Sequence, residues 1–302
     1  MESESLITLA IRLLNRAVLV TFLMPTLARA QSDPLERGRY LVETVAFCGV
    51  CHNARTPQGQ IIPGKELSGG RVMSMNEMRI VLSDIPPGEI RAVVPNITPD
   101  PETGIGRWTD AEIAAAIRQG RHRDGTTIGP PMPIELYQGL SDHDLTAIIA
   151  YLRTIPPVRN AVLQRSAYPF ELKSYAPVDH VVDPADNPVA RGAYIAGPLA
   201  HCVDCHTPAI SVVGRDWSQT GAGGIPFEGP WGIVVSRNIT PNKERGIGNW
   251  TDEQIITALT KGVSADGRRL MPPMGARAPI YARIAESDMR DLIAYLRSLP
   301  AL

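Results

Sequence analysis

Two short motifs with the same pattern constrain this chain more than any other feature. Residues 48–52 read CGVCH and residues 202–206 read CVDCH, and together they use all four cysteines. In such a motif the two thiols can each form a thioether to one porphyrin, and the histidine lies beneath its iron. The sequence therefore predicts two covalently bound haem c groups. Their predicted attachment residues are Cys48, Cys51 and the iron ligand His52, then Cys202, Cys205 and the iron ligand His206.

Two other interpretations of the cysteines are open. Each pair could be a redox dithiol or a periplasmic disulfide in a protein without haem, although neither role needs a histidine directly after the second cysteine. All four could bind one zinc ion, but motifs 154 residues apart would then have to meet. Zinc ribbons usually have much closer pairs. The histidine in both copies favours haem.

The length and the charge of the chain limit the number of domains and the kinds of partner that can be expected. At 302 residues there is room for two ordinary domains. The net charge of -1 gives no indication that the chain binds a nucleic acid or an anionic membrane surface.

The first 30 residues resemble an export signal. Two arginines precede a short apolar run at 17–24, and residues 28–30 (ARA) form a cleavage site, so the mature chain is expected to begin near Gln31. An uncleaved anchor is the alternative, although the apolar run is shorter than the roughly 20 residues that a membrane span needs. Export predicts a periplasmic protein, with peripheral association with the inner membrane as an option.

The remainder of the chain is an internal duplication. Gly38 and Tyr40 recur as Gly192 and Tyr194, with the same spacing as the two cysteine motifs. Both stretches predict a short helix leading into the haem site. A glycine on this helix allows another helix to approach closely, at a cost in helix propensity of about 1 kcal/mol. The expected partner is the helix that closes each repeat.

The two copies diverge after the cysteine motifs. Residues 56–94 and 207–237 are expected to be mostly loop around the porphyrin. The first copy has 12 more residues between its cysteine motif and the next sequence that the copies share. The first copy also lacks the GGIPF sequence that the second has at 223–227. Methionines in such apolar loops commonly fill space. Three are therefore expected to pack rather than to bind iron: Met73, Met75 and Met78.

The copies become similar again at residues 96–99 and 238–241, which both read NITP. A helix with a capping box and a terminal glycine is predicted after each. The residues concerned are Thr109, Glu112 and Gly120, then Thr251, Gln254 and Gly262. Apolar periodicity predicts closing helices at 141–154 and 287–298, which should cross the glycine-containing helices.

A methionine follows a proline pair at the same place in both repeats. Residues 130–133 read PPMP and residues 272–274 read PPM. Proline fixes φ and stiffens the loop that would present the thioether. Histidine with methionine is the axial pair of electron-transfer haem c, and it raises the reduction potential. The sequence predicts Met132 and Met274 as the second axial ligands, with Met271 as an alternative to Met274. The remaining histidines are expected to be structural: His122, His143, His180 and His201.

As a set, these motifs resemble dihaem class I c-type cytochromes. The similarity is to the cytochrome c subunits of periplasmic, membrane-associated alcohol, aldehyde and sugar-acid dehydrogenases. It implies an all-α fold with little or no sheet, built from two tandem cytochrome c domains at 34–157 and 187–302. A signal peptide (1–30) and a polar linker (158–186) complete the chain. Alcohol dehydrogenase subunits typically contain three haem motifs, whereas this chain has two.

The resemblance implies an electron-transfer protein rather than an enzyme. A dehydrogenase subunit would donate electrons, and a quinone, another cytochrome or a terminal oxidase would accept them. The alternative is a dihaem peroxidase, which has a similar length and two such motifs. Peroxide chemistry needs an iron with an open sixth position, whereas both repeats here offer a methionine.

Overall fold

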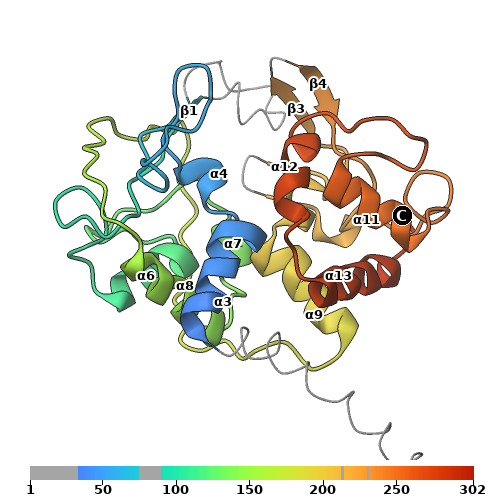
Figure 1. The fold of residues 1–302 in the computed structure, drawn as a ribbon, viewed down its shortest axis with the longest axis horizontal. Helices are drawn as coiled ribbons and strands as arrows, with labels where there is room; N and C mark the ends of the chain where they lie inside the picture. Colours follow the sequence, from blue (N-terminus) through green and yellow to red (C-terminus); the bar gives the residue numbers. More distant parts are fainter. Residues whose placement is uncertain (1–32, 75–89, 212–213, 230) are drawn as a thin grey trace, which may run out of the picture.

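Helices dominate the computed structural model, which describes residues 33–74, 90–211, 214–229 and 231–302 (Figure 1). The predicted helical fold with little sheet is confirmed. The first repeat contains α3 (Pro34–Tyr40), the π-helical turn η1 (Leu41–Val45), α4 (Gly49–His52), strands β1 (Val72–Ser74) and β2 (Arg91–Val93), α6 (Asp110–Gln119), α7 (Ile134–Tyr137) and α8 (Asp142–Thr154).

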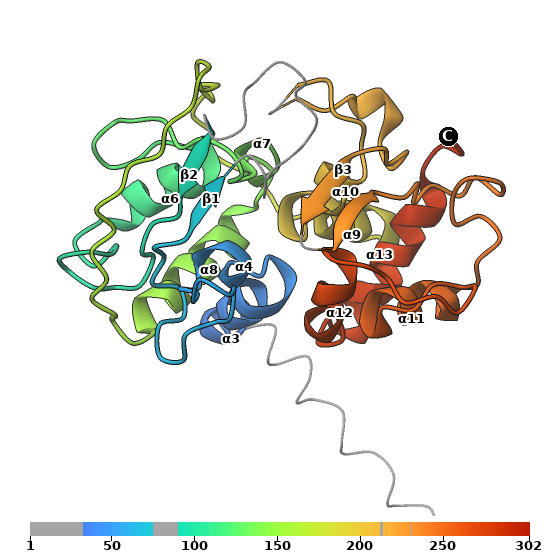
Figure 2. The ribbon, with the colours of Figure 1, turned by 90° about the horizontal axis from the view of Figure 1, so that it is seen from above.

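The second repeat has the same order of elements with one addition, the 3-10 turn η3. It contains α9 (Pro188–Tyr194), the π-helical turn η2 (Ile195–Leu199), α10 (Cys202–Cys205), η3 (Trp217–Gln219), β3 (Pro226–Gly229), β4 (Gly232–Val235), α11 (Asp252–Lys261), α12 (Met274–Tyr281) and α13 (Glu286–Ser298). Figures 1 and 2 show the two repeats side by side. Within the described residues no helix is both long and apolar enough to cross a membrane. The predicted export signal and Met75 and Met78 lie outside these residues.

The helix boundaries follow from local sequence. Asp33 and Asn187 cap α3 and α9 through their side chains, and each helix begins with a proline. Both predicted capping boxes are present, at Thr109 and Thr251. Their helices end at two left-handed glycines, Gly120 (φ 62°) and Gly262 (φ 64°), as expected.

The predicted crossing of the first and last helices occurs in both repeats. A Cβ atom on Gly38 would lie 2.0 Å from the carbonyl oxygen of Ala147 on α8. A Cβ atom on Gly192 would lie 1.9 Å from the carbonyl oxygen of Asp291 on α13. Both backbones therefore meet at a distance that only glycine permits.

The stretches after the cysteine motifs are not simply loops. Each contains a two-stranded antiparallel hairpin, β1–β2 in the first repeat and β3–β4 in the second. The 12 extra residues of the first repeat fall between β1 and β2. Gly69 and Gly70 precede β1 as Gly223 and Gly224 precede β3, with equivalent amide hydrogen bonds. The glycine pair thus recurs in space, although the sequence comparison missed it.

The connector between the repeats follows the surface of the first one and forms no helix among the residues described. Ala167 exchanges two backbone hydrogen bonds with Arg91 next to the hairpin (2.8 and 2.9 Å), and Val181 accepts one from the amide of Asp142 at the start of α8 (2.9 Å). Buried apolar residues of both repeats form one continuous core, which includes Leu41 and Ile195.

We expect Gly38→Ala and Gly192→Ala each to lower the free energy of unfolding by about 3 kcal/mol, because the new methyl group overlaps backbone that cannot move independently. Urea unfolding followed by circular dichroism measures the change. Gly197→Ala is the matched control, since a Cβ atom there would meet nothing within 4 Å. Equal stabilities for Gly38→Ala and Gly197→Ala would contradict the close crossing.

Candidate haem-binding sites

Both cysteine motifs lie on a single helical turn that follows the π-helical turn of their repeat. The amide of His52 donates to the carbonyl of Cys48, and the amide of His206 donates to the carbonyl of Cys202, both at 3.0 Å. Side chains three positions apart share a face of such a turn, so each pair of thiols lies together. The four cysteines form no disulfide.

The residue before the first cysteine has a left-handed backbone in both repeats. It is Phe47 in the first (φ 42°) and His201 in the second (φ 55°). This conformation costs an L-amino acid roughly 1–2 kcal/mol. The same unfavourable conformation occurs directly before the motif in both copies. This indicates that the placement of the cysteine motif, rather than the intrinsic preference of Phe47 or His201, determines the backbone conformation there.

The two predicted iron ligands are held in the same way. Nδ1 of His52 lies 3.0 Å from the carbonyl oxygen of Pro95, and Nδ1 of His206 lies 2.6 Å from that of Arg237. A carbonyl only accepts, so Nδ1 must carry the proton and Nε2 keeps its lone pair. Burial lowers the pKa of both imidazoles. Each histidine is therefore a neutral imidazole with Nε2 available for a metal.

The glycine pair after each motif allows this arrangement. The carbonyls of His52 and His206 accept hydrogen bonds from the amides of Gly69 and Gly223, both at 2.7 Å. A Cβ atom on Gly69 would lie 2.3 Å from the carbonyl carbon of Pro95. Because glycine has no such atom, the loop reaches the backbone that also binds Nδ1.

The thiols have the wrong acidity for a redox dithiol. Burial, followed by the neighbouring Cys51, raises the pKa of Cys48 to about 12. Burial and the adjacent cysteine likewise raise the pKa of Cys202 to about 12. Reactive cysteines depend on the opposite shift, because the thiolate is the nucleophile. The two pairs also do not converge: no group of three or more metal-binding side chains occurs in the described part of the chain.

The predicted methionine ligands occupy comparable places. Met132 is half-buried and packs against the same core as Cys48. Met274 is half-buried at the first residue of α12, whereas Met271 is 48% exposed. Met73 is buried against Ala92 and Val94 as expected for a packing residue.

The connector supports the first methionine loop, which sequence reasoning missed. The hydroxyl of Tyr168 donates to the carbonyl of Pro130 (2.8 Å), two residues before Met132. The ring of Tyr168 also packs on the small cluster around Met73 that Cys51 contacts. Linker residues were expected only to connect the domains, and nothing in their composition indicates this contact.

Two recurring tyrosines line the sites. Tyr137 at the end of α7 lies beside Cys48 and Cys51, and Tyr281 at the end of α12 lies beside Cys202. Burial raises the pKa of both hydroxyls, so both are neutral. Tyr137 follows Met132 by five residues and Tyr281 follows Met274 by seven, but each lies four residues before the N-cap of its closing helix, and this shared spacing would have been a usable sequence signal.

Two residues stand out between the repeats. His201 packs edge-on against Tyr137 of the other repeat (4.8 Å between ring centroids), and its buried Nε2 has no hydrogen-bond partner. This contact differs from the exposed or hydrogen-bonded role expected. Arg277 on α12 lies near cysteines of both motifs, Cys51 in the first repeat and Cys202 and Cys205 in the second, and their proximity acts to raise the pKa of its guanidinium against the effect of burial. No carboxylate in the described residues pairs with this guanidinium.

The other three histidines have ordinary surroundings. His122 packs edge-on against Trp108 (4.8 Å) and lies 2.9 Å from a carboxylate oxygen of Asp124. His143 and His180 are exposed on or near α8, and His180 contacts Asp142. Their structural role is as expected.

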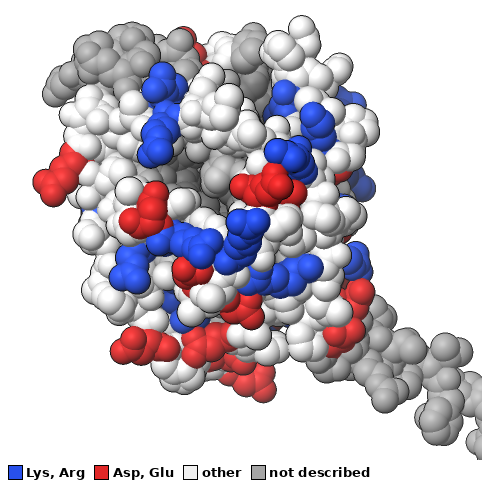
Figure 3. Space-filling model, turned by 90° about the vertical axis from the view of Figure 1, so that its left-hand side faces the viewer, with Lys and Arg blue, Asp and Glu red and all other residues white. Residues whose placement is uncertain are grey.

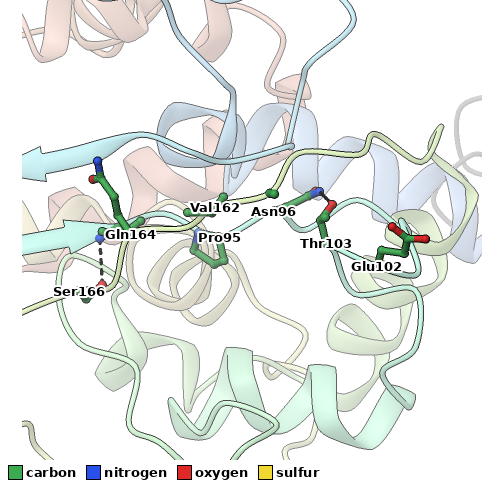
Figure 4. A pocket seen from close by; sticks show the side chains of 9 residues that line it. Pro95, Asn96, Glu102, Thr103, Val162, Gln164 and Ser166 are labelled. Atoms are coloured by element: carbon green, nitrogen blue, oxygen red, sulfur yellow. Dashed lines mark hydrogen bonds between the residues drawn. The ribbon is translucent and has the colours of Figure 1, made fainter.

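A groove under the connector is separate from the predicted haem residues. It has a volume of about 370 Å³ and lies between the loop from Pro95 to Thr103 and the connector from Ala161 to Ser166 (Figure 4). On the outer face of the first repeat, Lys and Arg are interspersed with Asp and Glu (Figure 3). That face shows no patch of one charge that would indicate a nucleic acid.

Comparison with known proteins identifies relatives that match most of the chain. The cytochrome c family profile matches residues 189–300. A protein described as "Diheme cytochrome c-type" from Cereibacter sphaeroides is 30% identical over 265 residues, which cover 84% of this chain and 82% of that protein.

Other relatives are subunits of larger enzymes. The fructose dehydrogenase cytochrome subunit of Gluconobacter japonicus is 31% identical over 92% of this chain and 55% of its own length. The gluconate 2-dehydrogenase cytochrome c subunit of Pantoea cypripedii is 28% identical over 94% of this chain and 64% of its own length. The chain thus spans about half to two thirds of these subunits.

Tyr168→Phe tests the support of the methionine loop. Losing the hydrogen bond to Pro130 should lower the free energy of unfolding by about 1 kcal/mol, measured by urea unfolding. Tyr175→Phe is the control, because Tyr175 lies on the same connector and its hydroxyl makes no hydrogen bond within the described part of the chain, while its ring contacts Lys173. An unchanged midpoint for Tyr168→Phe would show that the connector does not support this loop.

Proposed function

Because this chain belongs to the c-type cytochromes, in the group that includes dihaem cytochromes and dehydrogenase cytochrome subunits, we propose that it carries electrons on two covalent haem c groups. Each repeat would be one class I cytochrome c domain. The observation that carries the proposal is the duplicated histidine arrangement. In both repeats Nδ1 donates to a backbone carbonyl, and this leaves Nε2 as the donor that haem iron requires.

The residues present fit such a group. Two thiols share one face of a helical turn, the adjacent imidazole is neutral, and a thioether follows on a proline-stiffened loop. His52 and Met132 would be the axial ligands in the first repeat, and His206 and Met274 in the second. Haem supplies a one-electron couple when bound. The backbone carbonyls of Pro95 and Arg237 would fix the orientation of the two histidines, and the surrounding chain would limit access to the iron.

Two one-electron sites suit a dehydrogenase that oxidises its substrate by two electrons. The donor would be a dehydrogenase subunit in the periplasm, reached by export through residues 1–30. The acceptor would be a quinone, another cytochrome or an oxidase. The relatives described as dehydrogenase cytochrome subunits support this role. A dihaem peroxidase is not favoured, because both repeats carry a methionine in the same loop.

The proposal is tested by optical spectroscopy of protein exported from a host that attaches haem c. We expect two haems per chain, low-spin in both oxidation states and unaffected by carbon monoxide. A high-spin haem that binds carbon monoxide would indicate an open iron and would revive the peroxidase. A protein without haem would refute the proposal.

Met132→Ala and Met274→Ala should each lower the reduction potential of one haem by on the order of 100 mV, because thioether ligation raises it. Each variant should also make that haem bind carbon monoxide. Spectroelectrochemical titration measures both potentials. Met271→Ala, at the exposed methionine of the same loop, should change neither. A shift in Met271→Ala and none in Met274→Ala would reverse the ligand assignment.

Arg277→Gln should lower the potential of the second haem, and of the first to a smaller extent. A nearby, half-buried cation disfavours the oxidised, more positive iron, and its removal is expected to lower the potential by tens of millivolts. The control is Arg290→Gln, which removes the same charge from the exposed surface of α13. Potentials that shift equally in the two variants would show that Arg277 has no special effect.

A further inference from the structure

The two repeats hold each other through a reciprocal pair of tyrosines. Tyr40 on α3 donates to the carboxylate of Asp288 (2.8 Å) and accepts from the amide of Ala285 (3.0 Å), both at the start of α13. Tyr194 on α9 donates to the carboxylate of Asp144 (2.9 Å) and accepts from the amide of Ser141 (3.1 Å), both at the start of α8.

These contacts are equivalent under the duplication. In each direction a tyrosine two residues after the crossing glycine reaches the first turn of the closing helix in the other repeat. The free amides of a helix start need acceptors, and a hydroxyl from the opposite repeat supplies one. Burial and the nearby carboxylate raise the pKa of both tyrosines, so both hydroxyls keep the proton that they donate.

The partners of the two tyrosines differ in how deeply they are buried. Ser141 is fully buried, and Asp144 is 2% exposed and is also bound by Arg37 through two hydrogen bonds of 2.8 Å. Ala285 and Asp288 are only half-buried. Loss of the Tyr194 hydroxyl would leave a buried amide without a partner, whereas water can replace the Tyr40 hydroxyl. The Tyr194 contact should therefore contribute more than the Tyr40 contact to the association of the two repeats.

Other contacts place this interface beside the haem sites. Tyr137 packs on His201 next to the second cysteine motif. Arg283 donates to the carbonyl of Glu43 in η1 (2.7 Å), just before the first motif. The contacts thus run from the tyrosines to the segments that carry the attachment cysteines, without passing through the connector.

We propose that Tyr40 and Tyr194 are positioning residues that fix the two repeats in one arrangement, so that electrons pass between the haems within a single chain. The electron-exchange part of this inference rests on the proposed function, whereas the interface itself does not. Haem held at His52 and at His206 would supply the two one-electron couples for this exchange, one giving the electron that the other takes, so no further reactant would be needed.

The first test asks whether the interface holds the two repeats together without the covalent connector. A protease site inserted after Pro184 lies in an exposed part of the connector, beyond its contacts with the first repeat at Ala167 and Val181. The holoprotein is cleaved, and sedimentation measures the dissociation constant of the two halves. We expect the unsubstituted halves to stay together. Tyr40→Phe should weaken their association about tenfold, and Tyr194→Phe should weaken it more.

Matched variants show whether the effect belongs to the interface. Tyr168→Phe removes a hydroxyl that binds the carbonyl of Pro130 within the first repeat, so it should leave the association unchanged. Asp288→Asn weakens the acceptor of Tyr40. In a double-mutant cycle with Tyr40→Phe, the two changes should be non-additive. Unchanged association of the halves in the Tyr40→Phe/Tyr194→Phe variant would overturn the proposal.

The second test reads electron exchange in the uncleaved holoprotein. After flash photoreduction of one haem, the equilibration between haems should be independent of protein concentration. In the Tyr40→Phe/Tyr194→Phe variant it should slow by about tenfold or more, with both reduction potentials unchanged. An unchanged rate would overturn the positioning role even if association weakened. A chain that carries no haem would instead refute the proposed function, while the association assay would still report on the tyrosines.

Discussion

The contact on which the rest of the structure depends is the crossing of the first and last helices in each repeat. Because Gly38 and Gly192 have no side chain, these helices meet backbone to backbone. The first helix continues through a π-helical turn into the cysteine motif, so the crossing also sets the position of the thiols. The start of the last helix then faces the other repeat, where a tyrosine two residues after the glycine satisfies its amide.

Much of this helical framework, meaning the crossing helices and the helices with capping boxes, could be predicted, because its determinants are local or duplicated. The capping boxes at Thr109 and Thr251 mark the starts of their helices within three residues. The closing helices show an apolar face at a spacing of 3–4 residues. Gly38 and Gly192 were identified because a glycine at the same place in two predicted helices implies a close neighbour. The motif itself predicts a neutral, metal-binding histidine, and the structure holds both histidines in a manner consistent with that role.

The remainder depends on contacts between residues far apart in the chain. The acceptor for Nδ1 of His52 lies 43 residues away, and that for His206 lies 31 residues away. Each acceptor directly precedes the NITP sequence at 96–99 or 238–241. The recurring sequence therefore marks the place, but nothing in it shows that the carbonyl before it reaches a histidine so far away in the chain. The connector offered no signal either, since Tyr168 has neither periodicity nor a counterpart in the second repeat. Tyr40 and Tyr194 were recognised as a repeated pair, but only the packing of the repeats supplies their partners.

Two differences between the repeats lie near the predicted haem-binding sites rather than in the helical framework that the repeats share. Phe47 and His201 share a left-handed backbone and an equivalent position before the motif, yet one side chain is apolar and the other is an imidazole. Arg277 follows Met274 in the second repeat, whereas the first repeat has no arginine in the corresponding segment 133–136. The shared framework places the same predicted ligand residues, similarly buried, in both sites. We therefore expect any difference between the two reduction potentials to come from such unshared residues, because they make the electrostatic surroundings of the two sites unequal.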